Sequence, residues 1–279
     1  MKPARTALLC CLLAAGIVPL AAGQDAAPTV EAGKGWHYRV YAEHLPAVDN
    51  LAIAPDGSLY ATQELSDGKG KLLRVHNGRN ETIVSDLNRP DGLLAARGLL
   101  YVTEEVAEGR VLEVNPRSGA RRVLAVLHNP EGIGLLPDGG LVISEDSVSG
   151  RLVRLQEDGT AETLTGGLNR PEGLAVGGDG TIFFAETGTG RVLAYKDGEL
   201  DVLLDDLDEP DQVKLAPDGA LWVTEDARPG RLLRLKNGAL EVVLSGLMAP
   251  QGIAFAGNGV VLVAEQGRGR ILAVSGTAP

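Results

Sequence analysis

The chain has 279 residues, with 37 acidic and 26 basic side chains, a formal net charge of −11 and only 4% aromatic residues. So acidic a surface repels phosphate backbones and anionic lipid, which argues against nucleic acid and membrane surfaces as partners and favours cations or cationic ligands. The scarcity of aromatic residues argues against a long aromatic platform for polysaccharide.

Residues 1–23 have the pattern of a secretory signal sequence. Lys2 and Arg5 give a charged start, an apolar stretch follows, and small residues up to Gly23 offer a cleavage site. The apolar stretch is short for a membrane-spanning helix. Both cysteines fall inside it, so the processed chain would form no disulfide. We therefore expect a periplasmic or secreted protein, with residues 24–35 as a flexible N-terminal segment.

The rest of the chain repeats one pattern six times: a proline, an acid and a glycine, then apolar runs, a glutamate and Gly-Arg. The prolines recur every 39–41 residues. The opening motif reads Arg89-Pro90-Asp91-Gly92, Asn129-Pro130-Glu131-Gly132, Arg170-Pro171-Glu172-Gly173, Glu209-Pro210-Asp211-Gln212 and Ala249-Pro250-Gln251-Gly252, with Val48-Asp49-Asn50 as a degraded first copy. A repeat of this length with several short strands predicts a β-propeller.

Each unit contains four short apolar runs, joined in pairs by Asp-Gly or Asn-Gly turns. Such turns are strong hairpin signals, because both central residues are expected to have positive φ. In the unit that begins at Pro171, the runs are 174–176, 182–185, 192–195 and 200–204. We assign the turn acids Asp56, Asp138, Asp179 and Asp218 no task beyond the turn. Four antiparallel strands make one blade.

The last unit lacks a fourth strand after Ile271–Val274. The segment Trp36–Tyr41, before the first unit, has the fourth-strand pattern and can complete the last blade, which removes two exposed sheet edges. The sequence therefore predicts an all-β, six-bladed propeller over residues 36–275, closed by its N-terminal strand, with residues 276–279 as a tail.

The motif acids should form a ring at one mouth of the central channel, because each begins an innermost strand. Carboxylates that converge on one axis must stay solvated, share protons or bind a cation. Calcium is the best candidate, since it accepts many oxygen ligands in flexible geometry. Alternatively, each acid simply forms a turn after its proline. The candidate ligands are Asp49, Asp91, Glu131, Glu172 and Asp211.

A second set of acids ends the second strand of each blade. Each is followed within five or six residues by an arginine at the start of the third strand, which predicts structural cross-strand ion pairs. The set is Glu104, Glu145, Glu186, Glu225 and Glu265, opposite Arg110, Arg151, Arg191, Arg231 and Arg270; the first blade is the exception, with neutral Gln63 facing Lys71 across a longer loop.

His128 directly precedes Asn129-Pro130-Glu131 and is expected within reach of the channel mouth. It is a candidate for proton transfer, and the alternative is a solvated loop histidine.

The motif Pro-Asp-Gly, together with "APDGALWVTED" and "GRLLRL", resembles the gluconolactonase, senescence-marker-protein and luciferin-regenerating-enzyme superfamily. NHL-repeat and streptogramin-lyase propellers share the same pattern, and the resemblance covers residues 36–274. It implies one divalent cation at the channel mouth, held by Asp49, Glu131, Glu172 and Asp211, with Asp211 also acting in catalysis. Family members carry a glutamate at the position of Asp49 and asparagines in the middle blades, so four carboxylates around one cation depart from the family pattern.

Two hypotheses follow. The first is an exported, calcium-dependent hydrolase of a small lactone or ester, in which the cation polarises the carbonyl and Asp211, assisted by His128, takes a proton from the attacking water. The second is a non-catalytic propeller whose acidic face binds a protein, peptide or cationic ligand. The regularity of the blades favours the second hypothesis, and the ring of acids favours the first.

Overall fold

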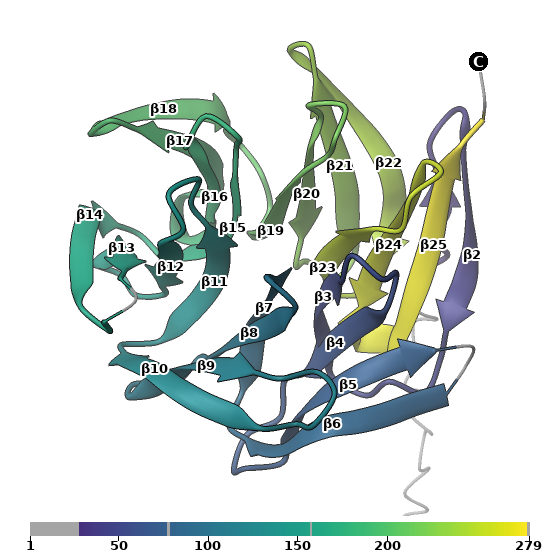
Figure 1. Cartoon of the computed structure of the whole chain (residues 1–279). Coiled ribbons are helices and arrows are strands. Elements are labelled where there is room, and N and C mark those ends of the chain that lie inside the picture. Colours follow the sequence, from purple (N-terminus) through teal and green to yellow (C-terminus); the bar gives the residue numbers. More distant parts are fainter. Residues whose placement is uncertain (1–27, 77–78, 157, 278–279) are drawn as a thin grey trace, which may run out of the picture.

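The computed structural model describes residues 28–76, 79–156 and 158–277. Their strands form six separate antiparallel sheets, arranged as a ring around a central channel (Figure 1). This confirms the predicted all-β, six-bladed propeller. The predicted signal sequence lies outside the described residues. Within the described ranges, no helix is long and apolar enough to cross a membrane.

In each blade the strands follow one another outward from the channel. The innermost strands are β3 (Val48–Ile53), β7 (Pro90–Ala96), β11 (Pro130–Leu135), β15 (Pro171–Val176), β19 (Pro210–Leu215) and β23 (Pro250–Phe255). The second strands are β4 (Leu59–Gln63), β8 (Leu99–Glu104), β12 (Leu141–Glu145), β16 (Ile182–Glu186), β20 (Leu221–Glu225) and β24 (Val260–Glu265).

The outer half of each blade is equally regular. The third strands are β5 (Gly70–His76), β9 (Gly109–Val114), β13 (Gly150–Leu155), β17 (Arg191–Lys196), β21 (Gly230–Lys236) and β25 (Arg270–Gly276). The outermost strands are β6 (Arg79–Leu87), β10 (Arg121–Leu127), β14 (Ala161–Leu168), β18 (Glu199–Leu204), β22 (Ala239–Leu247) and β2 (Trp36–Ala42). Two short 3-10 helices, η1 (Thr187–Thr189) and η2 (Gln266–Arg268), follow β16 and β24.

The N-terminal part of the described chain fastens the ring. As predicted, β2 pairs with β25, with Trp36 opposite Gly276. A further strand, β1 (Glu31–Ala32), pairs with β22 and gives the fifth blade five strands. It lies in the segment predicted to be flexible. The Trp36 ring packs edge-on against that of Trp222, with the ring centroids 5.4 Å apart, so the closing strand also contacts the neighbouring blade.

The hydrophobic core is divided into six clusters, one between each pair of adjacent blades. Alternate residues of each strand face one neighbouring blade or the other, because side chains alternate across a sheet. Phe184 and Leu152, for example, are fully buried between the third and fourth blades. This packing fixes the angle at which neighbouring innermost strands meet.

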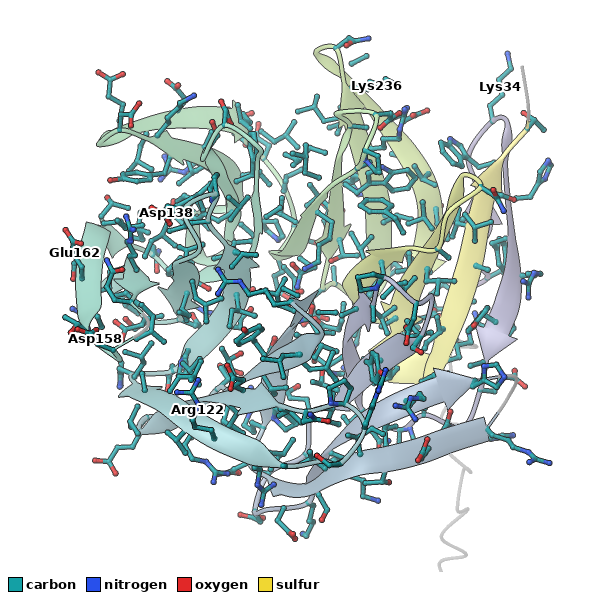
Figure 2. The ribbon with its side chains drawn as sticks, in the orientation of Figure 1. Lys34, Arg122, Asp138, Asp158, Glu162 and Lys236 are labelled. Carbon is teal, nitrogen blue, oxygen red and sulfur yellow. The ribbon has the colours of Figure 1, made fainter. Side chains whose placement is uncertain are left out.

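The turns between first and second strands differ in one respect from expectation. The carboxylates of Asp56, Asp138, Asp179 and Asp218 each accept the backbone N–H two residues later, which supports a purely structural role. Only the glycine of each of these turns has positive φ, so the expectation of two positive φ values is wrong here. Both central residues do have positive φ in the turns Asp197-Gly198 and Asn237-Gly238, which join third and fourth strands. Figure 2 labels Asp138, whose carboxylate also contacts Arg154 on the third strand of its blade.

Candidate metal centre at the mouth of the channel

A β-bulge positions the motif acid of every blade. The pairing register between first and second strands shifts at the acid and the residue after it, for example between Pro130 and Ile133. A bulge re-aims the side chains of its extra residue, and here it turns the acid toward the channel. The resulting set, called the motif ring, is Asp49, Asp91, Glu131, Glu172, Asp211 and Gln251.

Adjacent blades are locked together next to these acids. The Thr103 hydroxyl donates a hydrogen bond to the Glu131 carbonyl in the next blade, at 2.5 Å. Ser144 does the same for the Glu172 carbonyl, at 2.7 Å. A Cβ atom on Gly92 would lie 2.0 Å from the Glu131 carbonyl oxygen, so the motif requires glycine there.

Two blades carry a side chain in place of the motif glycine, Asn50 in the first and Gln212 in the fifth. Gln212 Nε2 donates to Asn50 Oδ1 at 2.7 Å, and Asn50 Nδ2 donates to Asp91 Oδ1 at 3.0 Å. Because the sixth blade separates the first and fifth, this Asn50–Gln212 bridge crosses the channel below the motif ring.

A second ring of polar side chains lies at the same mouth, and it was not predicted from the sequence. Each member directly follows the last residue of a second strand. Strand alternation is the signal that could have found it, since the residue after each strand-end glutamate must point to the opposite face of the sheet, away from the paired arginine. This rim ring consists of Glu64, Glu105, Asp146, Thr187, Asp226 and Gln266.

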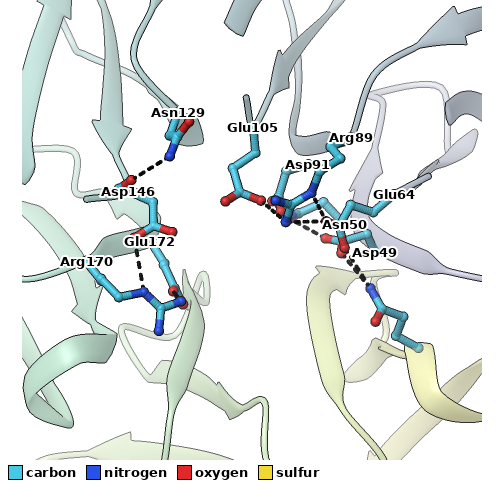
Figure 3. A network of polar contacts seen from close by, with 11 residues as sticks. Asp49, Asn50, Glu64, Arg89, Asp91, Glu105, Asn129, Asp146, Arg170 and Glu172 are labelled. Carbon is cyan, nitrogen blue, oxygen red and sulfur yellow. Dashed lines mark hydrogen bonds and ion pairs between the residues drawn. The ribbon is translucent and has the colours of Figure 1, made fainter. Parts of the chain in front are cut away.

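The two rings enclose a cavity of about 180 Å³. Ten of its fourteen lining residues carry a carboxyl group, and Arg89 and Arg170 are the two arginines. Arg89 forms ion pairs with Glu64, at 2.6 Å, and with Glu105. Arg170 bonds Glu172 at 2.5 Å and Asp146 at 3.3 Å (Figure 3). Two guanidinium groups cannot neutralise ten carboxylates, so the cavity favours protons or a cation.

Burial excludes one of the three alternatives for the motif ring, which are solvated carboxylates, shared protons and a bound cation. Asp49, Glu131 and Glu172 are each at most 5% exposed, so full solvation is excluded for them. Burial, and then the neighbouring carboxylates, raises the pKa values of Asp49, Asp91, Glu131 and Asp211 well above their usual range. Burial also raises the pKa of Glu105 to about 7 and that of Glu172 to about 8. The ring therefore holds protons or a cation at neutral pH.

Glu131, Glu172 and Asp211 form the group best suited to a cation. One carboxylate oxygen from each lies within 4.8 Å of the others. Calcium–oxygen bonds of 2.3–2.6 Å allow two ligands of one ion to lie up to about 5 Å apart. Within the described ranges, no hydrogen bond or ion pair reaches the carboxylates of Glu131 and Asp211, so their lone pairs remain open to the cavity.

Two other triplets are similarly close, but arginines bond two of the three members of each. The first is Glu64, Asp91 and Glu105, and the second is Glu105, Glu131 and Asp146. Arg89 contacts Glu64 and Glu105, and Arg170 contacts Asp146. Arginines thus pair with two of the three carboxylates in each of these triplets, but only with Glu172 in the group of Glu131, Glu172 and Asp211, which leaves that group as the primary cation candidate.

The strand-end glutamates form the predicted ion pairs. Glu104, Glu145, Glu186, Glu225 and Glu265 each contact the arginine that begins the third strand. The same glutamates accept a backbone N–H from the loop that enters their own blade, as Glu225 does from Asp208 at 2.9 Å. Gln63 lies opposite Lys71 and donates to the Pro46 carbonyl. Their role is structural.

His128 is exposed and is not among the residues that line the cavity. Its backbone N–H bonds Glu145, and its Nδ1 lies 3.1 Å from the Ala107 carbonyl. The structure thus brings Asp49, Asp91, Glu131, Glu172 and Asp211 together around one cavity and places His128 outside it.

No family model matches the chain, and no curated protein matches it in sequence. Solved structures do match. A gluconolactonase from Xanthomonas campestris shares 14% identity and a TM-score of 0.74, over 90% of this chain and 95% of that one. A streptogramin B lyase shares 17% identity and a TM-score of 0.64, over 88% of this chain and 99% of that one. The aldose sugar dehydrogenase from Streptomyces coelicolor, solved with PQQ, shares 18% identity and a TM-score of 0.67, over 88% of this chain and 99% of that one. The chain shares the propeller fold of these proteins.

Proposed function

We propose that this protein is a calcium-dependent hydrolase of a small lactone or ester, with its active site in the acidic cavity. The observation that carries the proposal is the buried group of Glu131, Glu172 and Asp211, whose oxygens lie within 4.8 Å of one another. The gluconolactonase among the fold relatives supports the choice of substrate class.

The residues at the cavity have two roles in this proposal, cation binding and proton transfer. Glu131, Glu172 and Asp211 would hold the cation, with Asp49 and Asp91 further along the motif ring. A calcium ion held there would polarise the substrate carbonyl. Asp211 takes a proton from the attacking water, and a neighbouring acceptor assists it.

Asp226 is the best-placed neighbouring acceptor. Its Oδ1 is buried and has no hydrogen-bond partner among the described residues. Burial raises the pKa of Asp226 to about 6, so the group is mostly ionised at neutral pH and can accept a proton. The proposal gives Asp226 the assisting role that the sequence suggested for His128, because His128 does not line the cavity.

Metal analysis combined with a lactone-hydrolysis screen tests the proposal. The purified protein should contain calcium, and hydrolysis should stop with chelator and return with calcium. Asp211→Asn should abolish hydrolysis and keep the melting temperature. Asp179→Asn, in a turn on the opposite face, is the matched control and should remain active. A metal-free protein without hydrolysis of any lactone or ester would refute the proposal.

The second candidate function is a binding module for a cationic ligand or a protein. Two observations favour it: the regular repetition of four antiparallel strands from blade to blade, and the excess of carboxylates over the two arginines in the cavity. Calcium or cationic peptide binding without hydrolysis would support this alternative.

We further propose export to the periplasm or the medium after cleavage near Gly23. Cell fractionation and N-terminal sequencing of the exported protein test this, and the first residue should be Gln24. A protein recovered in the cytoplasm with Met1 intact would contradict export.

A further inference from the structure

The opposite half of the central channel has a different character from the acidic mouth. Beyond the Asn50–Gln212 bridge lies a second cavity of about 350 Å³, lined by the innermost strands of all six blades. Its walls are mainly aliphatic, with Leu93, Ile133 and Leu174 as typical members. A volume of this size falls at the small end of ligand pockets in proteins.

Lys214, on β19, is the one ionisable residue among those that line this cavity. No hydrogen bond or ion pair to its ammonium group is found within the described ranges. Burial among apolar groups lowers the pKa of Lys214 to about 8, so the side chain is still mostly charged at pH 7. An ammonium group in apolar surroundings without a partner is unfavourable, and an anion that enters the cavity relieves this.

The cavity wall supplies further donors. Each innermost strand is the last strand of its sheet, so one of its edges faces the channel. A strand edge presents unpaired backbone N–H and C=O groups. An acid with an apolar body could therefore contact aliphatic side chains, accept backbone N–H bonds and pair with Lys214.

We propose that this second cavity is a binding site for a small apolar carboxylic acid, whose carboxylate pairs with Lys214. A monocarboxylate matches the single positive charge, and an aromatic or branched aliphatic body matches the walls. The site is independent of the acidic cavity, because the Asn50–Gln212 bridge lies between them.

Calorimetric titration of the full chain with 3-phenylpropionate at pH 7 tests the proposal, with 3-phenylpropanamide as the neutral control. Lys214→Met should weaken binding of the acid by about tenfold or more and leave binding of the amide unchanged, because it removes the charge but keeps an apolar side chain. Lys214→Arg should retain binding of the acid. Lys214→Gln serves in place of Lys214→Met if the latter does not fold.

Methyl NMR locates the bound acid. Saturable shifts should appear at Leu93, Ile133 and Leu174. The proposal is overturned if the wild-type protein shows no saturable binding, if Lys214→Met binds the acid as tightly as the wild type, or if the shifts fall outside the cavity.

Discussion

The side chains of Gln212 and Asn50 are joined by a 2.7 Å hydrogen bond across the central channel, although their blades are not adjacent. Both replace the glycine that four other blades carry, so the bridge is the main departure from six-fold symmetry along the channel. It ties the first and fifth blades together, past the sixth blade between them, directly beneath the motif ring.

We expect a double-mutant cycle of Asn50→Ala and Gln212→Ala to give a coupling energy of about 0.5–1.5 kcal/mol in urea unfolding, the usual net value of a hydrogen bond. Gln212→Ala combined with Glu113→Ala, on the third strand of the second blade, should be additive. Additivity of the Asn50 and Gln212 variants would show that the bridge does not stabilise the fold.

Glu225→Ala should lower the free energy of unfolding by about 2–4 kcal/mol, because it leaves Arg231 and the Asp208 N–H without their buried acceptor. The control is Glu113→Ala, whose partner Arg122 is largely exposed, and its cost should stay below about 1 kcal/mol. Equal costs in chemical denaturation would contradict a structural role for the strand-end glutamates.

Gly92→Ala should destabilise the protein by about 1–3 kcal/mol, because its Cβ atom would collide with the Glu131 carbonyl of the next blade. Gly178→Ala is the matched control, since no atom lies within 4 Å of the position that its Cβ atom would take. It should be neutral or stabilising by about 0.4–1 kcal/mol. Thermal melts of both variants check this, and a harmless Gly92→Ala would argue against close blade contact.

Without divalent cations, stability should fall as the pH rises from about 5 to about 8. Folding raises the pKa of Glu105 to about 7 and that of Glu172 to about 8, above their unfolded values. The folded state then binds more protons than the unfolded state in this interval, so removing protons favours unfolding. Melting temperatures measured with chelator should therefore decrease with pH, and Glu172→Gln should flatten the decrease.

Calcium should reverse this trend, because it binds the ionised carboxylates of the folded state only. Melting temperatures at pH 8 should rise with added calcium by several degrees. The same curve with and without calcium would mean that the cavity does not bind the ion.

Asp226→Asn should reduce kcat for lactone hydrolysis by about a hundredfold, the typical effect of removing a general base, with little change in calcium affinity. Calorimetry of calcium binding separates the two effects. Unchanged kcat would remove Asp226 from the mechanism, and lost calcium binding would make it a ligand.

The blade number, the N-terminal closing strand and the Glu–Arg pairs were predictable because each depends on spacing along the chain. Pro90 and Pro130 mark the period, and Glu104 with Arg110 spans a single hairpin. The motif ring followed from the same periodicity, and the structure brings its acids together around one cavity.

Other features depend on three-dimensional geometry and could not be read in this way. The Asn50–Gln212 bridge joins residues 162 positions apart, and only the diameter of the ring brings them together. The position of His128 depends on the course of one loop. The burial of Asp49 and Glu131 depends on the tilt of the blades, which core packing decides.

The sixth blade is built from both ends of the domain, and this affects when the ring can fold during synthesis. Strand β2 is synthesised before all six innermost strands and its partner β25 after them, so the ring cannot shut until the ribosome has released nearly the whole domain. Until then the blades form an open arc with exposed edges, a state prone to association and slow to resolve. Under the export proposed above, the chain would pass the membrane unfolded and the ring would close on the far side, which would confine that open arc to one compartment.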